Sequence, residues 1–230
     1  RRFVPCLPGR SPPASSAAAS SSPHERGPAG VLILVRHGES VANAQGLLLG
    51  RTDAELTDSG RLQAEQARAL VYGPVAEVRS SPLRRARDTA ALLDLGPPVV
   101  VDERWVEVDY GEFEGEPLGA IPAEVWQRWQ GDRDFRPEGG ETLAEVDHRI
   151  AAACEELFAT DGAGARRHDG DVVVVSHVSP IKAAVAWALG TVDLYWRLHL
   201  RTASVTRIGW SRSAPILHGF NEVAVAPRQA

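Results

Sequence analysis

The pattern of hydrophobic and polar residues changes near residue 30, where short hydrophobic runs begin to alternate with longer amphipathic runs. Val31–Val35 and Val172–Val175 are the clearest hydrophobic runs, being short, β-branched and bounded by polar or turn-forming residues. A strand that is hydrophobic at every position is typical of a sheet covered by helices on both faces. Weaker runs predicted as strands span residues 75–78, 99–101, 203–208 and 215–220.

The longer runs carry signals for the start and the end of helices. Thr57 precedes a run that ends at Tyr72-Gly73-Pro74, where glycine favours a left-handed cap and proline cannot continue a helix. Thr142 and Glu145 have the spacing of a capping box. Hydrophobic residues at helical spacing follow it, and this helix should end near Phe158.

Two further helices are expected where a serine and a proline follow a strand. Ser81-Pro82 and Ser179-Pro180 each place an N-cap residue before a proline at the first helical position. The alternation of strands and helices predicts one α/β domain over residues 30–225. Residues 1–29 have too little hydrophobic bulk to offset the entropy of ordering them, so we expect a disordered tail or a linker there.

The composition is that of an ordinary globular protein. Of 230 residues, 43% are hydrophobic and 24% are charged, and the net charge is −5 with a pI near 5.8. Nucleic-acid and membrane-surface binders usually carry a basic face, so neither kind of partner is expected. Lys182 is the only lysine among 25 basic residues, and arginine suits bidentate binding of phosphate or carboxylate.

The cysteines and the first residues favour a cytoplasmic location. Cys6 and Cys154 make neither a disulfide framework nor a zinc-ligand spacing. The first residues are basic, but prolines interrupt the run of about 7–15 hydrophobic residues that an export signal requires. No stretch approaches the roughly 18 hydrophobic residues of a membrane span.

Both clear strands run directly into a histidine. Arg36-His37-Gly38 follows the first strand, and Ser176-His177 follows the second. In an open α/β sheet the ligand crevice lies outside the carboxyl ends of the strands, so both imidazoles should face the same crevice. Histidines that only make structural hydrogen bonds are the alternative. The repeated placement, with an arginine and a glycine beside the first histidine, favours a site.

A third predicted strand, at residues 75–78, is followed by Ser80-Ser81-Pro82 and a cluster of arginines. A helix N-terminus binds anions through its free N–H groups and its dipole. Arg85 lies in the first turn of this predicted helix and adds a bidentate donor for phosphate. Arg84 and Arg87 are expected on the solvated face of the helix.

Several motifs occur in order between residues 31 and 221: R-H-G-E-S with Asn43, L-T-D-S-G, S-S-P-L-x-R-A-x-x-T-A, E-x-D-Y-G-E-F-E-G, G-G-E-T and V-V-S-H. This set resembles the histidine phosphatase superfamily, which has the phosphoglycerate-mutase-like fold. Locally the sequence is most similar to bacterial acid phosphatases and α-ribazole phosphatases. The resemblance implies a mixed, mostly parallel sheet with helices on both faces, and a hydrolase that acts on small phosphomonoesters.

The resemblance also implies a role for each matching residue. His37 matches the histidine that is phosphorylated, and His177 matches the second histidine of the pocket. Arg36 and Arg85 match arginines that bind the phosphoryl oxygens, and Glu107 matches the proton donor. The residues that match further phosphate or substrate contacts are Ser40, Asn43, the backbone at Gly50, and Val178.

These residue types suit phosphoryl transfer. Two arginines and a second imidazole can hold the equatorial oxygens, and flanking cations favour the neutral form of His37, whose free nitrogen is the nucleophile. Glu107 must be protonated to act as an acid, and a bound phosphate dianion favours that form. We therefore expect activity at mildly acidic pH, with no metal ion and no organic cofactor.

Other chemistries receive weaker support. Asp132 with Asp134, and Asp169 with Asp171, could be metal-binding pairs, but each pair lies in a glycine-containing turn where solvated aspartates are usual. Cys154 lies at helical spacing and is interpreted as a small core residue. The sequence has no P-loop motif.

A cofactor-dependent phosphoglycerate mutase is the alternative function. The spacings from His37 to Glu107 and to His177 are shorter than in the mutases, which favours a phosphatase. A non-catalytic phospho-ligand sensor would need a lost nucleophile or acid, and neither is lost. A homodimer and a fused upstream domain, such as the ribonuclease H module of some similar proteins, are left open.

The segment from Gly111 to Gly140 is predicted to select the substrate, because it lies between the expected acid and the next helix. Its tryptophans and the arginines of interest are Trp126, Arg128, Trp129, Arg133 and Arg136. The two tryptophans, three residues apart, could equally pack on one helical face. The substrate itself is not predicted, since Val178, Phe113 and Thr142 stand where the family commonly has glycine, tryptophan and serine.

Overall fold

The computed structural model describes residues 30–160, 168–192, 194–210 and 214–224; the predicted tail, with Cys6, lies outside these ranges. The strands are β1 (Leu32–Arg36), β2 (Val75–Ser80), β3 (Val99–Val101), β4 (Asp171–Ser176), β5 (Val205–Trp210) and β6 (Pro215–Glu222). The α-helices are α1 (Val41–Ala44), α2 (Asp58–Ala67), α3 (Arg84–Leu93), α4 (Ala123–Gly131), α5 (Leu143–Phe158) and α6 (Val178–Ala188). Short 3-10 helices occupy Arg68–Leu70, Glu103–Trp105 and Gly111–Phe113.

All of the runs predicted as strands join one sheet, in the order β3-β2-β4-β1-β5-β6. The first four strands in this order are parallel, whereas β5 is antiparallel to β1 and β6 is antiparallel to β5. The predicted mixed, mostly parallel sheet is confirmed. The order places β1 and β4 side by side in the middle of the sheet.

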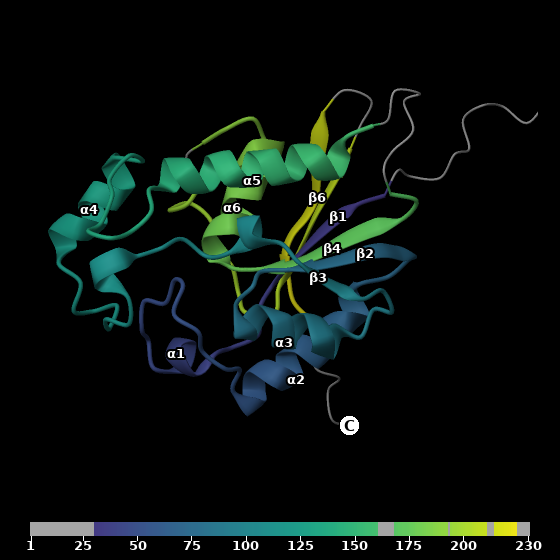
Figure 1. The fold of residues 1–230 in the computed structure, drawn as a ribbon, viewed down its shortest axis with the longest axis horizontal. Coiled ribbons are helices and arrows are strands. Elements are labelled where there is room, and N and C mark those ends of the chain that lie inside the picture. The colour runs from purple at the N-terminus through teal and green to yellow at the C-terminus, as the bar shows by residue number, and fades with distance from the viewer. Residues whose placement is uncertain (1–29, 161–167, 193, 211–213, 225–230) are drawn as a thin grey trace, which may run out of the picture.

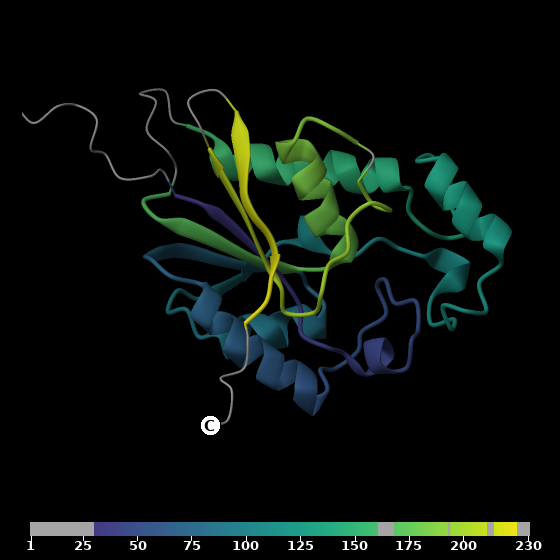
Figure 2. The same cartoon turned by 180° about the vertical axis from the view of Figure 1, so that it is seen from behind.

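Helices cover both faces of this sheet, as predicted. In β1, Leu32 and Leu34 pack in a core with α5 and α6, and Ile33 and Val35 pack in a second core with α2 and α3. Figures 1 and 2 show the two helical pairs on opposite sides of the strands. Because successive strand residues point to opposite faces, burial on both sides requires the unbroken hydrophobic run.

Two predicted helix starts are confirmed. The side chain of Thr57 accepts a backbone hydrogen bond as the N-cap of α2. Thr142 and Glu145 form a reciprocal capping box at the start of α5, which ends at Phe158. The helix after Thr57 ends at Ala67 and continues as a 3-10 turn, so it is shorter than its stop signals suggest.

The two serine–proline starts are wrong in position. α3 begins at Arg84 rather than directly after Ser81, and the Ser81 hydroxyl, which accepts the N–H of Leu83 ahead of the helix, also makes a long-range contact described below. α6 begins at Val178, so Ser179 and Pro180 lie inside its first turn. Proline is tolerated there because the first N–H groups of a helix have no intrahelical partner.

The segment Gly111–Gly140 carries α4, and its two ends lie side by side. The N–H of Glu112 bonds the carbonyl oxygen of Glu138 at 2.9 Å, and the N–H of Glu141 bonds that of Asp109 at 2.9 Å. Gly111 has a φ of +54°, and a Cβ there would lie 2.1 Å from the Glu138 oxygen, so only glycine fits this stem. The segment has a small core of its own with Leu48, Ile121, Trp129 and Phe135.

Cys154 is fully buried in the core under α5, and burial raises the pKa of its thiol. Its interpretation as a core residue is confirmed. Within the described residues, none of the helices has the length and apolar character needed to cross a membrane.

Candidate active site

Two histidines meet at the carboxyl ends of adjacent parallel strands. β1 and β4 pair in a register that places Arg36 opposite Ser176, and each is followed directly by a histidine. The ring centroids of His37 and His177 are 5.0 Å apart. Both rings are buried, with His37 only 4% exposed. The structure thus brings the two predicted histidines together at the edge of the sheet expected from the strand pattern.

The hydrogen bond of His37 decides which ring nitrogen is free. Its Nδ1 lies 2.7 Å from the carbonyl oxygen of Gly38. A carbonyl can only accept, so Nδ1 carries the ring proton and Nε2 of the neutral ring has a free lone pair. Burial, followed by the charges of Arg85 and Arg36, holds the pKa of His37 well below 6.5. The ring is therefore neutral at pH 7 and has a nucleophilic nitrogen.

Within the residues that the structure describes, His177 has one buried ring nitrogen without a partner. Its Nε2 lies 2.7 Å from Oγ of Ser81, and that oxygen accepts the N–H of Leu83 at 3.3 Å. A hydroxyl can donate to a ring nitrogen or accept from it, so this contact is compatible with either tautomer of His177. Nδ1 is buried and has no hydrogen-bond partner among the described residues. Burial and the charge of Arg85 hold the pKa of His177 well below 6.5.

Two arginines flank the histidines. Arg85 is 1% exposed and donates to two backbone carbonyl oxygens, that of Gly50 at 2.6 Å among them. Arg36 donates to the carbonyl oxygen of Leu200 at 2.6 Å, while its Nε is buried and unpartnered in the described part of the chain. Burial lowers the pKa of both guanidinium groups, and Glu107 opposes that shift. Both stay cationic, because arginine is not deprotonated in proteins at neutral pH.

Glu107 lies at the N-terminus of α6. Its Oε2 accepts the N–H of Val178 at 3.0 Å, and its Oε1 accepts the N–H groups of Ser179 at 3.1 Å and Val108 at 2.9 Å. The side chain is buried. Backbone N–H groups and the helix dipole stabilise a carboxylate in this position. Glu107 therefore caps α6, a role hidden in the sequence because the bonded residues are 71 positions apart.

Ser40 and Asn43, two of the residues predicted to bind substrate, cap one another in α1. The Ser40 hydroxyl accepts the N–H of Asn43, and Oδ1 of Asn43 accepts the N–H of Ser40, both at 3.2 Å. These bonds fix the turn that follows Gly38. Contact of either side chain with substrate stays a prediction.

Gly50 and Val178, the other two, act through their backbones. The carbonyl of Gly50 holds Arg85, and a Cβ at Gly50 would lie 2.3 Å from the carbonyl oxygen of Val108, so the close approach requires glycine. The N–H of Val178 is bonded to Glu107. Their substrate contacts also stay predictions.

Thr89 supports the site and was missed from the sequence. Its Oγ1 accepts the N–H of Gly38 at 3.1 Å and donates to the carbonyl oxygen of Arg85 at 2.7 Å, so it joins the histidine loop to α3. Thr89 lies four residues after Arg85 and hence on the same helical face, a signal that could have identified it. Ser81 was also misassigned, as a helix cap rather than a partner of His177.

Two of the aspartates considered as metal ligands accept backbone hydrogen bonds instead, Asp132 within a turn and Asp171 from a residue distant in the sequence. Oδ1 of Asp132 accepts the N–H of Asp134 at 2.9 Å, and Oδ1 of Asp171 accepts the N–H of Val31 at 2.8 Å. Across residues 30–160, 168–192, 194–210 and 214–224, no group of three or more His, Cys, Asp or Glu side chains is arranged to hold a metal ion.

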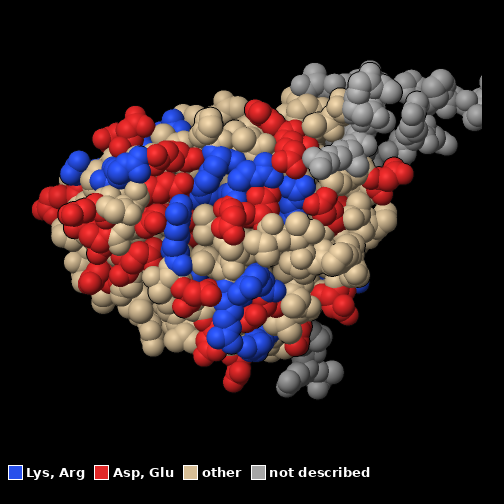
Figure 3. Space-filling view, viewed as in Figure 1, with Lys and Arg blue, Asp and Glu red and all other residues tan. Residues whose placement is uncertain are grey.

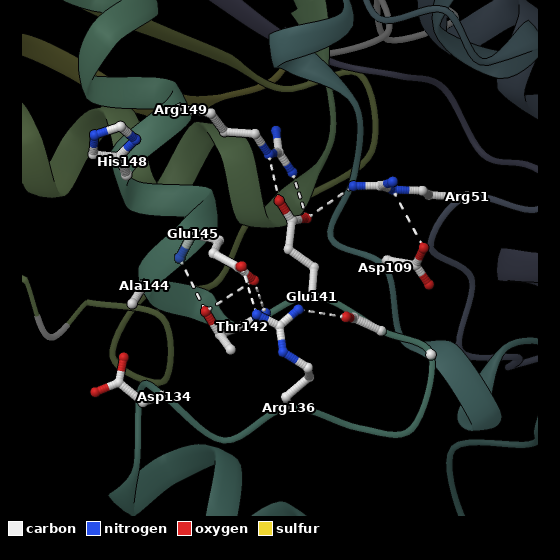
Figure 4. Close-up of a pocket in the computed structure, with 12 residues that line it drawn as sticks. Arg51, Asp109, Asp134, Arg136, Glu141, Thr142, Ala144, Glu145, His148 and Arg149 are labelled. Carbon is white, nitrogen blue, oxygen red and sulfur yellow. Dashed lines mark hydrogen bonds and ion pairs between the residues drawn. The ribbon is translucent and has the colours of Figure 1, made fainter.

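A large recess of about 850 Å³ lies beside the stem of the α4 segment and is lined by charged side chains. Figure 4 shows Arg51 and Arg149 converging on Glu141, which accepts hydrogen bonds from them at 3.2 Å and 2.8 Å. Arg149 also donates to the carbonyl oxygen of Arg104. These bonds brace the backbone on both sides of Glu107. Neither His37 nor His177 lines this recess.

The charged side chains of one face are unevenly distributed. In Figure 3, acidic side chains gather over the end of the molecule where α4 lies, and basic and acidic side chains interleave along its middle. Two arginines predicted to act in substrate selection are paired there: Arg133 with Asp147, and Arg136 with Glu145. Arg128 instead lies over the ring of Phe135 at 4.0 Å.

Residues 32–223 match the model of the histidine phosphatase superfamily, branch 1. Together with the sheet and the pair of strand-end histidines, this match shows that the chain belongs to that superfamily. The resemblance seen in the motifs is confirmed, over the length of the predicted domain.

Individual relatives are similar over most of this chain. The bifunctional protein Rv2228c of Mycobacterium tuberculosis is 37% identical over 185 residues, which are 76% of this chain and 49% of that protein. This chain therefore spans about half the length of that relative. A glucosyl-3-phosphoglycerate phosphatase of Mycolicibacterium vanbaalenii is 36% identical over 69% of this chain and 74% of its own.

Solved structures share the fold. A phosphoserine phosphatase from Entamoeba histolytica, in complex with 3-phosphoglyceric acid, superposes with a TM-score of 0.75 at 26% identity. The superposition covers 85% of this chain and 98% of that one.

Proposed function

We propose that this domain is a phosphatase that hydrolyses small phosphomonoesters through a phosphohistidine on His37, without a metal ion. One observation carries the proposal. The free Nε2 of a buried, neutral histidine lies near the charges of Arg36 and Arg85, and two buried polar atoms of the site, Nε of Arg36 and Nδ1 of His177, have no partner in the described residues. Buried polar groups are normally bonded, and the arginine nitrogen can only donate, so this group of atoms suits an anion with several oxygens. The phosphatase names of relatives support the same reaction class.

The proposed reaction has two steps. Nε2 of His37 attacks phosphorus, the bond from phosphorus to the ester oxygen breaks, and the leaving oxygen takes the proton of Glu107. Water then attacks the phosphohistidine while Glu107 takes back a proton, and the P–N bond breaks to release inorganic phosphate. Arg36 and Arg85 neutralise charge on the transferred oxygens in both steps, and the neutral imidazole of His177 completes the pocket beside them.

Rapid quenching with a phosphorus-labelled substrate tests the nucleophile. Wild type should carry label on His37, and His37→Ala should lose both the label and measurable turnover. His148→Ala is the matched control, because His148 is an exposed histidine in α5, away from the sheet edge. Label found on a serine or on Cys154 would refute the mechanism.

Treatment with EDTA tests the proposed metal independence. Activity should be unchanged after chelation and dialysis, since arginines and a second imidazole supply the charge stabilisation that metal ions provide elsewhere. Complete loss of activity, restored by Mg²⁺ or Zn²⁺, would contradict the proposal.

The same pocket could serve a phosphoglycerate mutase, so mutase activity on 3-phosphoglycerate should be measured in parallel with phosphate release. We expect phosphate release to dominate. The proposal keeps the cytoplasm as the location. It also keeps a homodimer and an upstream fused domain as open arrangements, which size measurement of the full-length protein would decide.

A further inference from the structure

A second recess, of about 120 Å³, lies beside Glu107 and is lined mostly by aromatic side chains. It is bounded by α4, α6, the start of α5 and the segment that follows α6. Its lining residues are Tyr110, Trp126, Trp129, Leu143, Val178, Ser179, Lys182, Tyr195 and Trp196.

This recess adjoins the proposed proton donor. Val178 and Ser179 line it, and their N–H groups hold the carboxylate of Glu107. Tyr110 is hydrogen bonded to Ser179 and lies close enough to Glu107 and Arg36 to interact with their charges. The proton donor of a phosphomonoesterase must reach the ester oxygen, so a recess beside it faces the alcohol part of the substrate.

The walls of the recess are flat and partly open. Trp126 and Trp196 lie edge to face with centroids 6.0 Å apart, and Trp126 also contacts Trp129. Trp129 is buried, whereas Trp196 is 42% exposed. The two tryptophan rings pack together, as one interpretation of the sequence expects, and both also line the recess. Their part in substrate selection stays a prediction. A large exposed aromatic surface in a concave site is typical of a binding surface.

The volume limits what can bind. The recess of about 120 Å³ is smaller than the engineered cavity of about 150 Å³ that encloses one benzene molecule, so it takes one ring at most. Because its wall is partly open at Trp196, the ring need not be fully enclosed. Lys182 adds a polar group, and its Nζ donates to the carbonyl oxygen of Tyr195 at 2.6 Å. An ammonium group has three N–H donors, so this bond leaves donors that can bind an oxygen substituent on the ring.

We propose that this recess binds one benzene-sized ring, aromatic or saturated, in the alcohol part of the substrate. The inference rests on the proposed function, since it names the substrate class of that site. The preferred substrates are phosphomonoesters of a short alcohol that bears such a ring, rather than phosphates of unbranched alcohols.

A pair of substrates with similar leaving groups tests the inference. Benzyl phosphate and ethyl phosphate both release an alkoxide, so the ratio of their kcat/KM values reports binding of the ring rather than leaving-group chemistry. Wild type should prefer benzyl phosphate by about tenfold or more, the usual effect of filling an apolar pocket. A carboxylate on the ring should raise the preference further, and Lys182→Met should remove that extra gain.

Variants of Trp196 test whether the preference for benzyl phosphate arises in this recess. Trp196→Ala should lower kcat/KM for benzyl phosphate about tenfold and leave ethyl phosphate within about twofold, whereas Trp196→Phe should keep most of the preference. Tyr72→Ala is the control, because Tyr72 is an exposed aromatic residue outside the recess.

The outcomes separate the inference from the function it rests on. If both substrates are hydrolysed with equal kcat/KM by wild type, the ring site is wrong and the phosphatase stands; this comparison does not depend on any variant folding. If neither substrate is hydrolysed and neither transfers labelled phosphate to His37, the proposed function is wrong. The proposed ring site is then wrong as well.

Discussion

At the scale of single residues, Glu107 meets two opposed demands. As the cap of α6 its carboxyl oxygens accept three backbone N–H bonds. As the proposed proton donor it must give a proton from one of the same oxygens to the leaving group.

Glu107→Gln should separate these two roles. An alkyl phosphate leaves as a basic alkoxide, so its kcat/KM should fall by about 10²–10⁴-fold, whereas p-nitrophenyl phosphate should lose much less. The pH profile should flatten on the side where the acid deprotonates. A purely structural role would slow both substrates alike and leave the profile unchanged, and the acid would then be sought at Glu39 or Asp109.

The sequence located the two histidines better than the residues that support them. His37 and His177 were identifiable because each follows an unbroken hydrophobic strand. The contact of Ser81 with His177 was not, because the two residues are 96 positions apart. Thr89 had only its spacing from Arg85 as a signal, since its bond to Gly38 spans 51 positions.

At the scale of elements, the helix starts show when a local signal is sufficient. The capping box of Thr142 and Glu145 involves residues three apart, and it formed as predicted. α6 has no side-chain cap from its own N-cap residue, and Glu107 from a distant segment takes that role. Capping by a distant side chain leaves no local pattern, which is why Ser179 was misplaced.

Thr142→Ala should lower the free energy of unfolding by about 1 kcal/mol, since an N-cap hydroxyl typically contributes that much. Urea unfolding monitored by circular dichroism measures it. Thr142→Ser keeps the hydroxyl and should retain most of the stability. A loss as large in Thr142→Ser as in Thr142→Ala would assign the effect to the methyl group instead of the cap.

At the scale of the whole molecule, two neutral histidines buried at the carboxyl ends of the two central strands link stability to pH. The pKa of each lies well below the value of about 6.5 that it has in an unfolded chain. Below pH 6.5 the unfolded chain therefore binds protons that the folded domain does not, so stability rises with pH in that range. This contribution is fully present above about pH 6.5 and is lost as the pH falls.

The free energy of unfolding should accordingly drop by about 2–3 kcal/mol between pH 7.5 and pH 5.5 from the two histidines together. Urea unfolding at a series of pH values measures the drop. His37→Gln and His177→Gln should each remove about half of it, and the exposed His148→Gln should remove none. An unchanged pH dependence in the two buried variants would show that these rings are protonated in the folded domain.

The fold class and the mixed sheet were predictable because strand direction and layer order follow from the pattern of hydrophobic runs and from the family motifs. The aromatic recess was not predictable, since it joins Trp126, Lys182 and Trp196 from separate segments of the chain. The shape of such a cavity depends on the path of each loop between the elements of the fold. The spacing of hydrophobic residues along the chain does not specify that path.

The stem of the α4 segment has a consequence for protein engineering. The hydrogen bonds of Glu112 to Glu138 and of Glu141 to Asp109 close the base of the segment, and two bonds between Leu48 and residues Gly115 and Glu116 hold it to the loop after α1. The entropy of closing a loop rises only slowly with its length. Segments of other lengths that keep these bonds should therefore fit on the same stem, while the histidines stay where the strands hold them.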